Sequence, residues 1–229
     1  MRPINEDSYY APVGGERFCA VADGMGGHNA GEVASAMAVK VFSEYMRPVE
    51  SISAQALYAA VEQANDEVYH AALENDGMSG MGTTFSALAE QDDSVFMAHV
   101  GDSRIYLVRK GAIMQVTTDH TLVEQLVQRG LITPREARFH PRRNIITRAL
   151  GTEPSVEIDI VQMGLHPGDV FFLCSDGMTN YVEESDILQA VMSDMDWQEK
   201  LNHLLSIALE NGGADNITAL FAVFEEAAN

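Results

Sequence analysis

Basic residues are scarce in this chain of 229 residues, where 14 Lys and Arg stand against 34 Asp and Glu and give a formal net charge of −20. A protein that binds the phosphate backbone of a nucleic acid needs clustered Lys and Arg, so this balance argues against nucleic acid as a partner. Solubility explains most of the acidic residues on the surface. Carboxylates that stand beside apolar segments need a separate explanation.

Long apolar runs and cysteines are also few. No apolar run reaches the roughly 18 residues of a membrane-spanning helix, and the first residues have neither the basic nor the apolar stretch of a signal peptide. The two cysteines, Cys19 and Cys174, both lie inside apolar, strand-like segments. Cysteines in such segments are typically small, buried residues whose thiols stay reduced. The sequence therefore predicts a cytoplasmic protein that does not bind a membrane.

Four aspartates next to glycines adjoin apolar segments too short for helices, which is typical of buried strands. Three follow such a segment and the fourth precedes one: Asp23, Asp102, Asp176 and Asp215. Asp-Gly is also a common turn dipeptide. However, carboxylates gathered at one end of a core repel one another until a proton or a cation relieves the repulsion. Oxygen-only ligand sets suit Mg²⁺ or Mn²⁺ rather than zinc, so the spacing predicts a metal site.

The order of the predicted elements indicates an α+β protein. Apolar residues at helical spacing predict helices near residues 29–48, 54–75, 184–192 and 197–209. Short apolar segments predict strands at residues 18–22, 85–89, 95–100, 105–108, 112–116, 156–161, 170–174 and 217–224. Short turns between successive strands favour antiparallel pairing. Two antiparallel sheets with helix pairs outside them fit this order, which gives one domain over residues 1–229.

Six short motifs resemble the signature blocks of the metal-dependent type-2C (PPM) protein phosphatases, and they occur in family order over nearly the whole chain. They are RPINED (residues 2–7), DGMGGH (23–28), GTT (82–84), GDSR (101–104), SDG (175–177) and DN (215–216). The Asp-Gly-Met-Gly-Gly form is similar to the bacterial branch. The resemblance implies a four-layer α-β-β-α sandwich of two antiparallel sheets flanked by helix pairs, with a small flap subdomain beside the active site.

The flap is expected at about residues 119–151. A short helix is predicted to end at Gly130, and Thr133 and Glu136 form the pattern of a capping box around Pro134, which starts a second helix. This segment is the most basic part of an acidic chain. Segments beside active sites can select substrates without taking part in the chemistry.

The resemblance also implies a metal set of two Mn²⁺ or Mg²⁺ ions with a possible third. Asp23 would bridge the two ions, and the carbonyl of Gly24 would bind one of them. Asp176 and Asp215 would be the remaining ligands, and Asp102 with Asp176 would form a weaker third site. Glu6 and Asp7 would hold coordinated water or orient the ligands. Cations here would also offset the repulsion between an acidic chain and a phosphorylated substrate.

The implied reaction is hydrolysis of phosphoserine and phosphothreonine. A metal-bridging hydroxide would attack phosphorus in line, without a phosphoenzyme, and Arg2 would bind the substrate phosphate. Many eukaryotic members have a histidine where this chain has Met25, so His28 and a metal-bound water remain as candidates for the proton donor to the leaving alkoxide. His28 could instead cap the following helix. His99, within a strand, is expected to be a hydrogen-bonded core residue.

The resulting hypothesis is a monomeric bacterial protein serine/threonine phosphatase that opposes a cognate kinase and acts on the phosphoproteins made by that kinase. One alternative is a pseudophosphatase that binds phosphoproteins without turnover. Only the N-terminus favours it, because family members have a strand upstream of residues 2–7 that this sequence lacks; one sheet should then have an altered edge. Another alternative is a phosphatase dedicated to a single regulatory partner.

Overall fold

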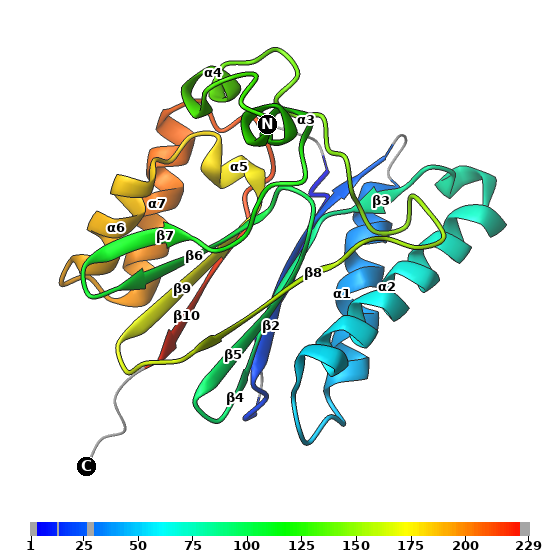
Figure 1. The fold of residues 1–229 in the computed structure, drawn as a ribbon, viewed down its shortest axis with the longest axis horizontal. Helices are drawn as coiled ribbons and strands as arrows, with labels where there is room; N and C mark the ends of the chain where they lie inside the picture. Colours follow the sequence, from blue (N-terminus) through cyan, green and yellow to red (C-terminus); the bar gives the residue numbers. More distant parts are fainter. Residues whose placement is uncertain (1–3, 13, 27–29, 225–229) are drawn as a thin grey trace.

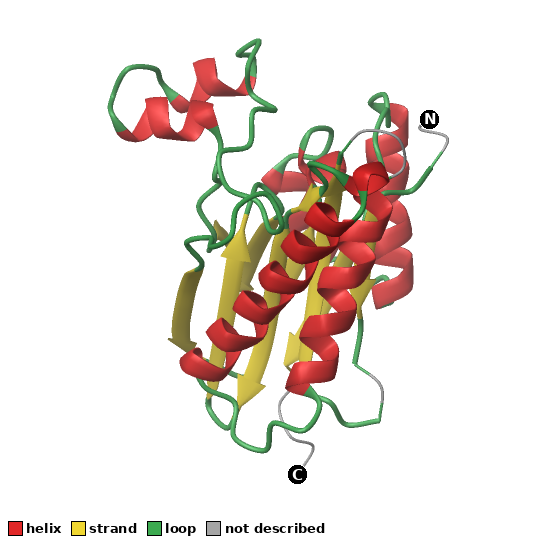
Figure 2. Ribbon diagram, turned by 90° about the vertical axis from the view of Figure 1, so that its right-hand side faces the viewer, coloured by secondary structure: helices red, strands yellow, loops and turns green. Residues whose placement is uncertain are grey.

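The structure is a computed structural model that describes residues 4–12, 14–26 and 30–224 (Figure 1). Two antiparallel sheets face each other, and helices cover the outer face of each sheet (Figures 1 and 2). The predicted α+β fold, a four-layer α-β-β-α sandwich, is confirmed. Arg2 and His28 lie outside the described residues.

The first sheet has the order β1-β2-β4-β5-β8, and the short strand β3 also pairs with β2. Its strands are β1 (Asp7–Tyr10), β2 (Phe18–Met25), β3 (Gly82–Thr83), β4 (Phe85–Gln91), β5 (Ser94–Val100) and β8 (Asp159–Gly164). Strand β1 has a polar sequence and was not predicted. Its pairing with β2 places Asp7 directly opposite Asp23. The strand predicted at residues 156–161 begins later, because β8 pairs with β5 from Asp159 to Gly164.

The second sheet has the order β10-β9-β6-β7. Its strands are β6 (Arg104–Arg109), β7 (Ala112–Gln115), β9 (Asp169–Cys174) and β10 (Ala219–Phe224). Every residue of β9 is buried, because both faces of this central strand are covered. Alternate side chains point to opposite faces, so Phe171 and Leu173 pack between the sheets while Phe172 and Cys174 pack against the helices. Both cysteines are buried free thiols, as expected.

Helices α1 (Gly31–Met46) and α2 (Ala54–Glu74) cover the first sheet, and α6 (Glu184–Met192) and α7 (Trp197–Glu210) cover the second. The predicted start of α2 at Ala54 is confirmed: the Ser53 side chain caps the helix by accepting a hydrogen bond from the Ala56 amide at 3.2 Å. No helix within the described ranges has both the length and the apolar character needed to cross a membrane.

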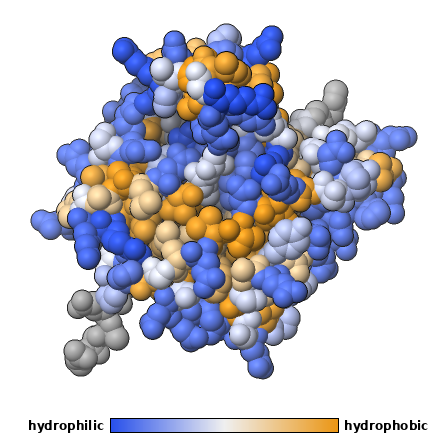
Figure 3. Space-filling view, in the orientation of Figure 1, coloured by the Kyte–Doolittle hydropathy of each residue, from blue (hydrophilic) through white to orange (hydrophobic). Residues whose placement is uncertain are grey.

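The segment predicted as the flap leaves the sandwich after β7 and projects from one end of it (Figure 2). It contains α3 (Leu122–Gln128) and α4 (Pro134–Arg138). The capping box of α4 is present, since the Glu136 amide donates to the Thr133 hydroxyl and the Thr133 amide donates to the Glu136 carboxylate. Figure 3 shows both hydrophilic and apolar side chains on the flap and a band of apolar residues below it on the same face.

Candidate metal centre

Asp23 stands near the end of β2, where its backbone is held on both sides. Its amide donates a 2.9 Å hydrogen bond to the Thr84 hydroxyl, and its carbonyl accepts bonds of 2.9 Å from the Thr84 amide and from the Thr83 hydroxyl. These bonds fix the direction in which the Asp23 carboxylate leaves the sheet. Asp7, its cross-strand partner on β1, places a second carboxylate beside it.

Asp7 is buried, and its two carboxylate oxygens have different surroundings. Oδ2 accepts a 2.8 Å hydrogen bond from the Ser175 hydroxyl, which in turn accepts one from the Thr218 amide. Oδ1 is buried without a hydrogen-bond partner among the described residues. A buried polar atom of this kind calls for an explanation, and a cation or an ordered water would supply one.

Asp176 is the first residue of α5 (Asp176–Thr179), which follows β9 after Ser175. The loop that carries Asp215 is pressed against this helix: a Cβ on Gly177 would lie 1.9 Å from the Asn216 carbonyl oxygen. The same loop holds the start of the described chain, because the Asn216 side chain accepts from the Glu6 amide at 3.0 Å and donates to the Ile4 carbonyl at 3.2 Å. Residues 4–7, 176 and 215 are thereby brought together.

Gly24 and Glu6 present oxygens close to the first turn of α1. The Gly24 amide donates to the Glu6 carbonyl at 3.0 Å. A Cβ on Gly31 would lie 2.9 Å from the Gly24 carbonyl oxygen and 2.6 Å from Glu6 Oε1, so both oxygens lie close to the same point. The backbone at Gly24 is also crowded, because a Cβ there would lie 2.0 Å from the Gly31 carbonyl oxygen.

Asp102 lies in the turn between β5 and β6 and is buried, with Oδ1 lacking a hydrogen-bond partner in the described part of the chain. Burial first, and then the negative charges of Asp176 and Asp119, raise the pKa of its carboxyl to about 7, although Arg104 opposes the shift. Asp102 and Asp176 therefore lie close enough to repel each other, as the prediction of a shared site requires.

The pKa of Asp23 depends on the charges of the four other aspartates. Burial raises the pKa of Asp23 well above its ordinary value, and the next causes, in order of size, are the charges of Asp7, Asp176, Asp102 and Asp215. Burial likewise raises the pKa of Asp7, with Asp176 and Asp215 adding to the shift. Five aspartates from five separate segments thus share one electrostatic environment, and a multivalent cation would relieve the repulsion between them.

These residues fit an open, oxygen-rich cation site. Among residues 4–12, 14–26 and 30–224, no group of three or more His, Cys, Asp or Glu side chains is arranged so that these side chains alone could hold a metal ion. Mg²⁺ keeps several waters and uses one or two carboxylates, so it does not need such a cage. The unpartnered oxygens of Asp7 and Asp102 and the carbonyl of Gly24 are oxygen donors of the type that hard divalent cations prefer.

The family model described as "Protein phosphatase 2C" matches residues 3–218. The chain belongs to the protein phosphatase 2C family. The resemblance carried by the six motifs is therefore confirmed.

Named relatives and solved structures agree with this membership. The chain is 39% identical to serine/threonine phosphatase stp of Listeria monocytogenes over 227 residues, which is 96% of this chain and 90% of that protein. The crystal structure of Stp1 from Staphylococcus aureus has a TM-score of 0.93 at 35% identity, with 98% of this chain and 91% of that chain covered. The PstP catalytic domain in complex with two manganese ions has a TM-score of 0.89 at 36% identity, with 99% and 94% covered.

In this 2C family member, a cavity of about 700 Å³ lies between the aspartate cluster and the flap. Asp102 and Asp176 line one side of the cavity, and Phe139 and Arg143 of the flap line another. Arg138 of α4 forms an ion pair with Glu183, which also lines the cavity, and so connects the flap to the segment before α6.

Three residues hold the aspartates of this family member and were not given roles from the sequence: Thr84, Ser175 and Asn216. Each lies inside one of the six motifs, so the signal was present, but only their contacts reveal what they do. His99 is a buried, hydrogen-bonded core residue, as expected: its ring lies 2.9 Å from the Ser86 hydroxyl and 3.1 Å from the Thr118 carbonyl. Arg2 and His28 remain predictions, because they lie outside the described residues.

The Asp102→Asn variant is expected to have a larger free energy of unfolding than the wild type when both are free of metal. This margin, the difference between the two free energies of unfolding, should grow as the pH rises. The Asp102 carboxyl has a folded-state pKa of about 7 against an ordinary 3.8, so between these values only the folded state keeps the proton. The wild type therefore loses stability as the pH rises through this window, whereas Asn does not titrate.

Urea unfolding in EDTA at about pH 5.5 and about pH 7.5 should show the margin widening by roughly 2 kcal/mol. Comparing the two proteins at each pH cancels the contributions of the titrating groups that do not interact with Asp102. A margin that stays constant or narrows would contradict the burial of an ionised Asp102.

Proposed function

We propose that this chain is a protein serine/threonine phosphatase, with one catalytic domain over residues 1–229 and a flap at about 119–151. The observation that carries the proposal is the cluster of five aspartates, in which buried oxygens of Asp7 and Asp102 have no hydrogen-bond partner among the described residues. The names of the relatives support the substrate class, and the manganese in a solved relative supports metal dependence.

The proposed metal set is Asp23, the Gly24 carbonyl, Asp176 and Asp215, with Glu6 and Asp7 holding coordinated water and Asp102 joining Asp176 at a weaker third site. Divalent cations at these positions would supply positive charge for the substrate phosphate and would activate a water molecule. We propose that these cations are Mn²⁺ or Mg²⁺.

The protein's own contribution is to hold its carboxylates in place before the substrate arrives. Thr84 fixes the backbone of Asp23, and Ser175 fixes one oxygen of Asp7. Preorganised charges need no rearrangement during the reaction, which is a main source of catalytic power in enzymes. Arg2 as the ligand of the substrate phosphate and His28 as the proton donor complete the proposal.

Hydrolysis of a phosphothreonine peptide with Mn²⁺ and with EDTA tests this function. We expect phosphate release with Mn²⁺, loss of activity in EDTA, and recovery when Mn²⁺ is added back, because the carboxylates alone repel a phosphate. A phosphotyrosine peptide of the same sequence is the control for substrate class. Full activity after exhaustive chelation would contradict the metal-dependent mechanism.

The pseudophosphatase alternative has no observation in its favour. A protein that binds phosphoproteins without turnover would be expected to lack acidic ligands, but the aspartates of the metal set are all present and lie together. We propose that the substrates are phosphoproteins made by a cognate bacterial kinase and that the enzyme acts as a monomer. The free buried thiols of Cys19 and Cys174 support the reducing cytoplasm as its location.

Replacing Arg142 and Arg143 with Gln is expected to raise KM for a phosphoprotein by about fivefold and to leave kcat nearly unchanged. Both arginines are exposed on the flap, and Arg143 lines the cavity that adjoins Asp102 and Asp176. A contact made equally in the ground state and the transition state changes KM rather than kcat.

A small aryl phosphate is too short to reach the flap, so its kinetics should not change. Arg129→Gln is the matched control, because Arg129 is an exposed flap arginine that does not line the cavity. An equal loss on both substrates would mean that these arginines support the fold or the metal centre instead.

A further inference from the structure

Both backbone polar groups of Gly101 are hydrogen-bonded to one residue, His120. The Gly101 amide donates to His120 Nδ1 at 3.1 Å, and the Gly101 carbonyl accepts from the His120 amide at 2.7 Å. On its other side Gly101 is pressed against Thr84: it has φ +110°, and a Cβ would lie 2.6 Å from the Thr84 side chain. The residue before Asp102 is thus fixed between His120 and the threonine that holds Asp23.

These contacts determine the protonation state of the His120 ring. Because Nδ1 accepts from an amide, the ring proton is on Nε2, which donates to Asp159 Oδ2 at 3.2 Å. Arg148 Nη1 lies 3.1 Å from the same ring nitrogen and donates to the other oxygen of Asp159 at 3.0 Å. The ring is buried and lies 4.9 Å, centroid to centroid, from the ring of His99. Burial lowers the pKa of His120, which agrees with a neutral ring.

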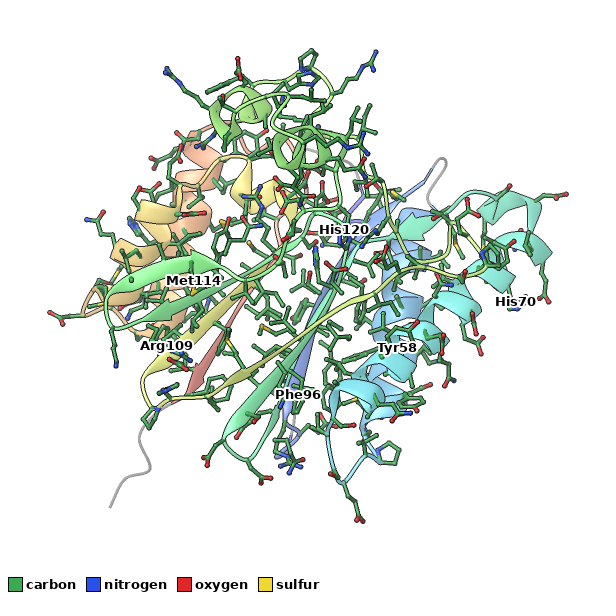
Figure 4. All side chains as sticks on the ribbon, in the orientation of Figure 1. Tyr58, His70, Phe96, Arg109, Met114 and His120 are labelled. Atoms are coloured by element: carbon green, nitrogen blue, oxygen red, sulfur yellow. The ribbon has the colours of Figure 1, made fainter. Side chains whose placement is uncertain are left out.

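His120 also lies at the point where the chain enters and leaves the flap. Its carbonyl accepts a 2.7 Å hydrogen bond from the Thr147 amide, and the Leu122 amide donates to the Ile145 carbonyl at 2.9 Å. These bonds join the two ends of the flap beside the sheets, where His120 is labelled in Figure 4. His120 therefore contacts the turn that carries Asp102 through its side chain, and it holds the base of the flap through its backbone.

We propose that His120 is a positioning residue for the phosphatase reaction. Through Nδ1 and its backbone amide it holds the Gly101–Asp102 turn so that the Asp102 carboxylate faces Asp176, and it keeps this turn in register with the base of the flap. This inference rests on the proposed function for its kinetic consequence, but the hydrogen bond itself can be measured without any activity. His120 does not touch the substrate in this role.

Two variants of similar polarity separate the two ends of the ring. In His120→Asn the side-chain oxygen can stand near the position of Nδ1 and accept from the Gly101 amide, whereas in His120→Gln the amide reaches the position of Nε2 and leaves Gly101 without its acceptor. We expect kcat to fall by about tenfold in the Gln variant and by less than about threefold in the Asn variant, with KM for an aryl phosphate nearly unchanged.

Asp159→Asn is the control, since it alters the partner of Nε2 and keeps the bond to Gly101; we expect its kcat to match that of His120→Asn. Hydrogen exchange of the Gly101 amide, followed by NMR in metal-free protein, should quicken only in the Gln variant. Equal kinetic losses in the Asn and Gln variants, with unchanged exchange, would overturn the proposal.

The wild type offers a measurement that needs no variant. The ¹⁵N spectrum of the His120 ring should show the proton on Nε2 and an accepting Nδ1, and a proton on Nδ1 would overturn the proposal even if the variants fail to fold. If the wild type hydrolyses no phosphopeptide, the proposed function fails, while the NMR results still decide whether His120 holds the turn.

Discussion

The Asp176→Asn variant should lose roughly 100-fold in both Mn²⁺ affinity and kcat for a phosphothreonine peptide. Asn keeps the shape of the side chain and removes one formal charge. Asp176 contributes to the repulsion that raises the pKa values of Asp23 and Asp102, so it lies within their shared environment. Calorimetric titration with Mn²⁺ and steady-state kinetics on the same preparation should show the two losses together.

Asp194→Asn is the matched control, because Asp194 is an exposed aspartate between α6 and α7 and lies away from the cluster. It should bind Mn²⁺ and turn over substrate like the wild type. If Asp176→Asn bound Mn²⁺ with unchanged affinity, Asp176 would have to be removed from the metal set.

The Gly177→Ala variant is expected to lose about 3 kcal/mol or more of folding free energy and to lower Tm by roughly 10 °C. The conformation of Gly177 is ordinary, so the reason is space rather than backbone strain. The added Cβ would lie 1.9 Å from the Asn216 carbonyl oxygen, a backbone atom that cannot move aside without displacing the loop of Asp215. Thermal unfolding followed by circular dichroism measures the stability.

Gly164→Ala is the control for glycine substitution as such. A Cβ on Gly164 would meet its nearest neighbour, the His166 ring, at 3.8 Å, which is an ordinary contact. Its Tm should stay close to that of the wild type. A Gly177→Ala protein with wild-type stability and activity would show that the loop carrying Asp215 can move without cost, and the proposed rigidity of the site would be wrong.

Much of the fold follows from local patterns. The apolar segments at residues 95–100, 105–108 and 170–174 are strands, and the caps at Ser53 and Thr133 mark helix starts. These features depend on side chains within a few positions of one another, so they can be read from the sequence. Strand β1 was missed because Asp7–Tyr10 has no apolar alternation of its own; its pairing with β2 makes it a strand.

The sequence by itself determined which residue types the site contains, because the aspartates stand in recognisable motifs beside glycines. Only the tertiary structure decided how they are held. The Ser175 hydroxyl reaches Asp7 across 168 positions, and Asn216 reaches Glu6 across 210. The contact between His120 and Gly101 likewise joins a strand turn to the base of the flap. Such partners depend on how the two sheets and the flap pack, and no local pattern of the chain contains that information.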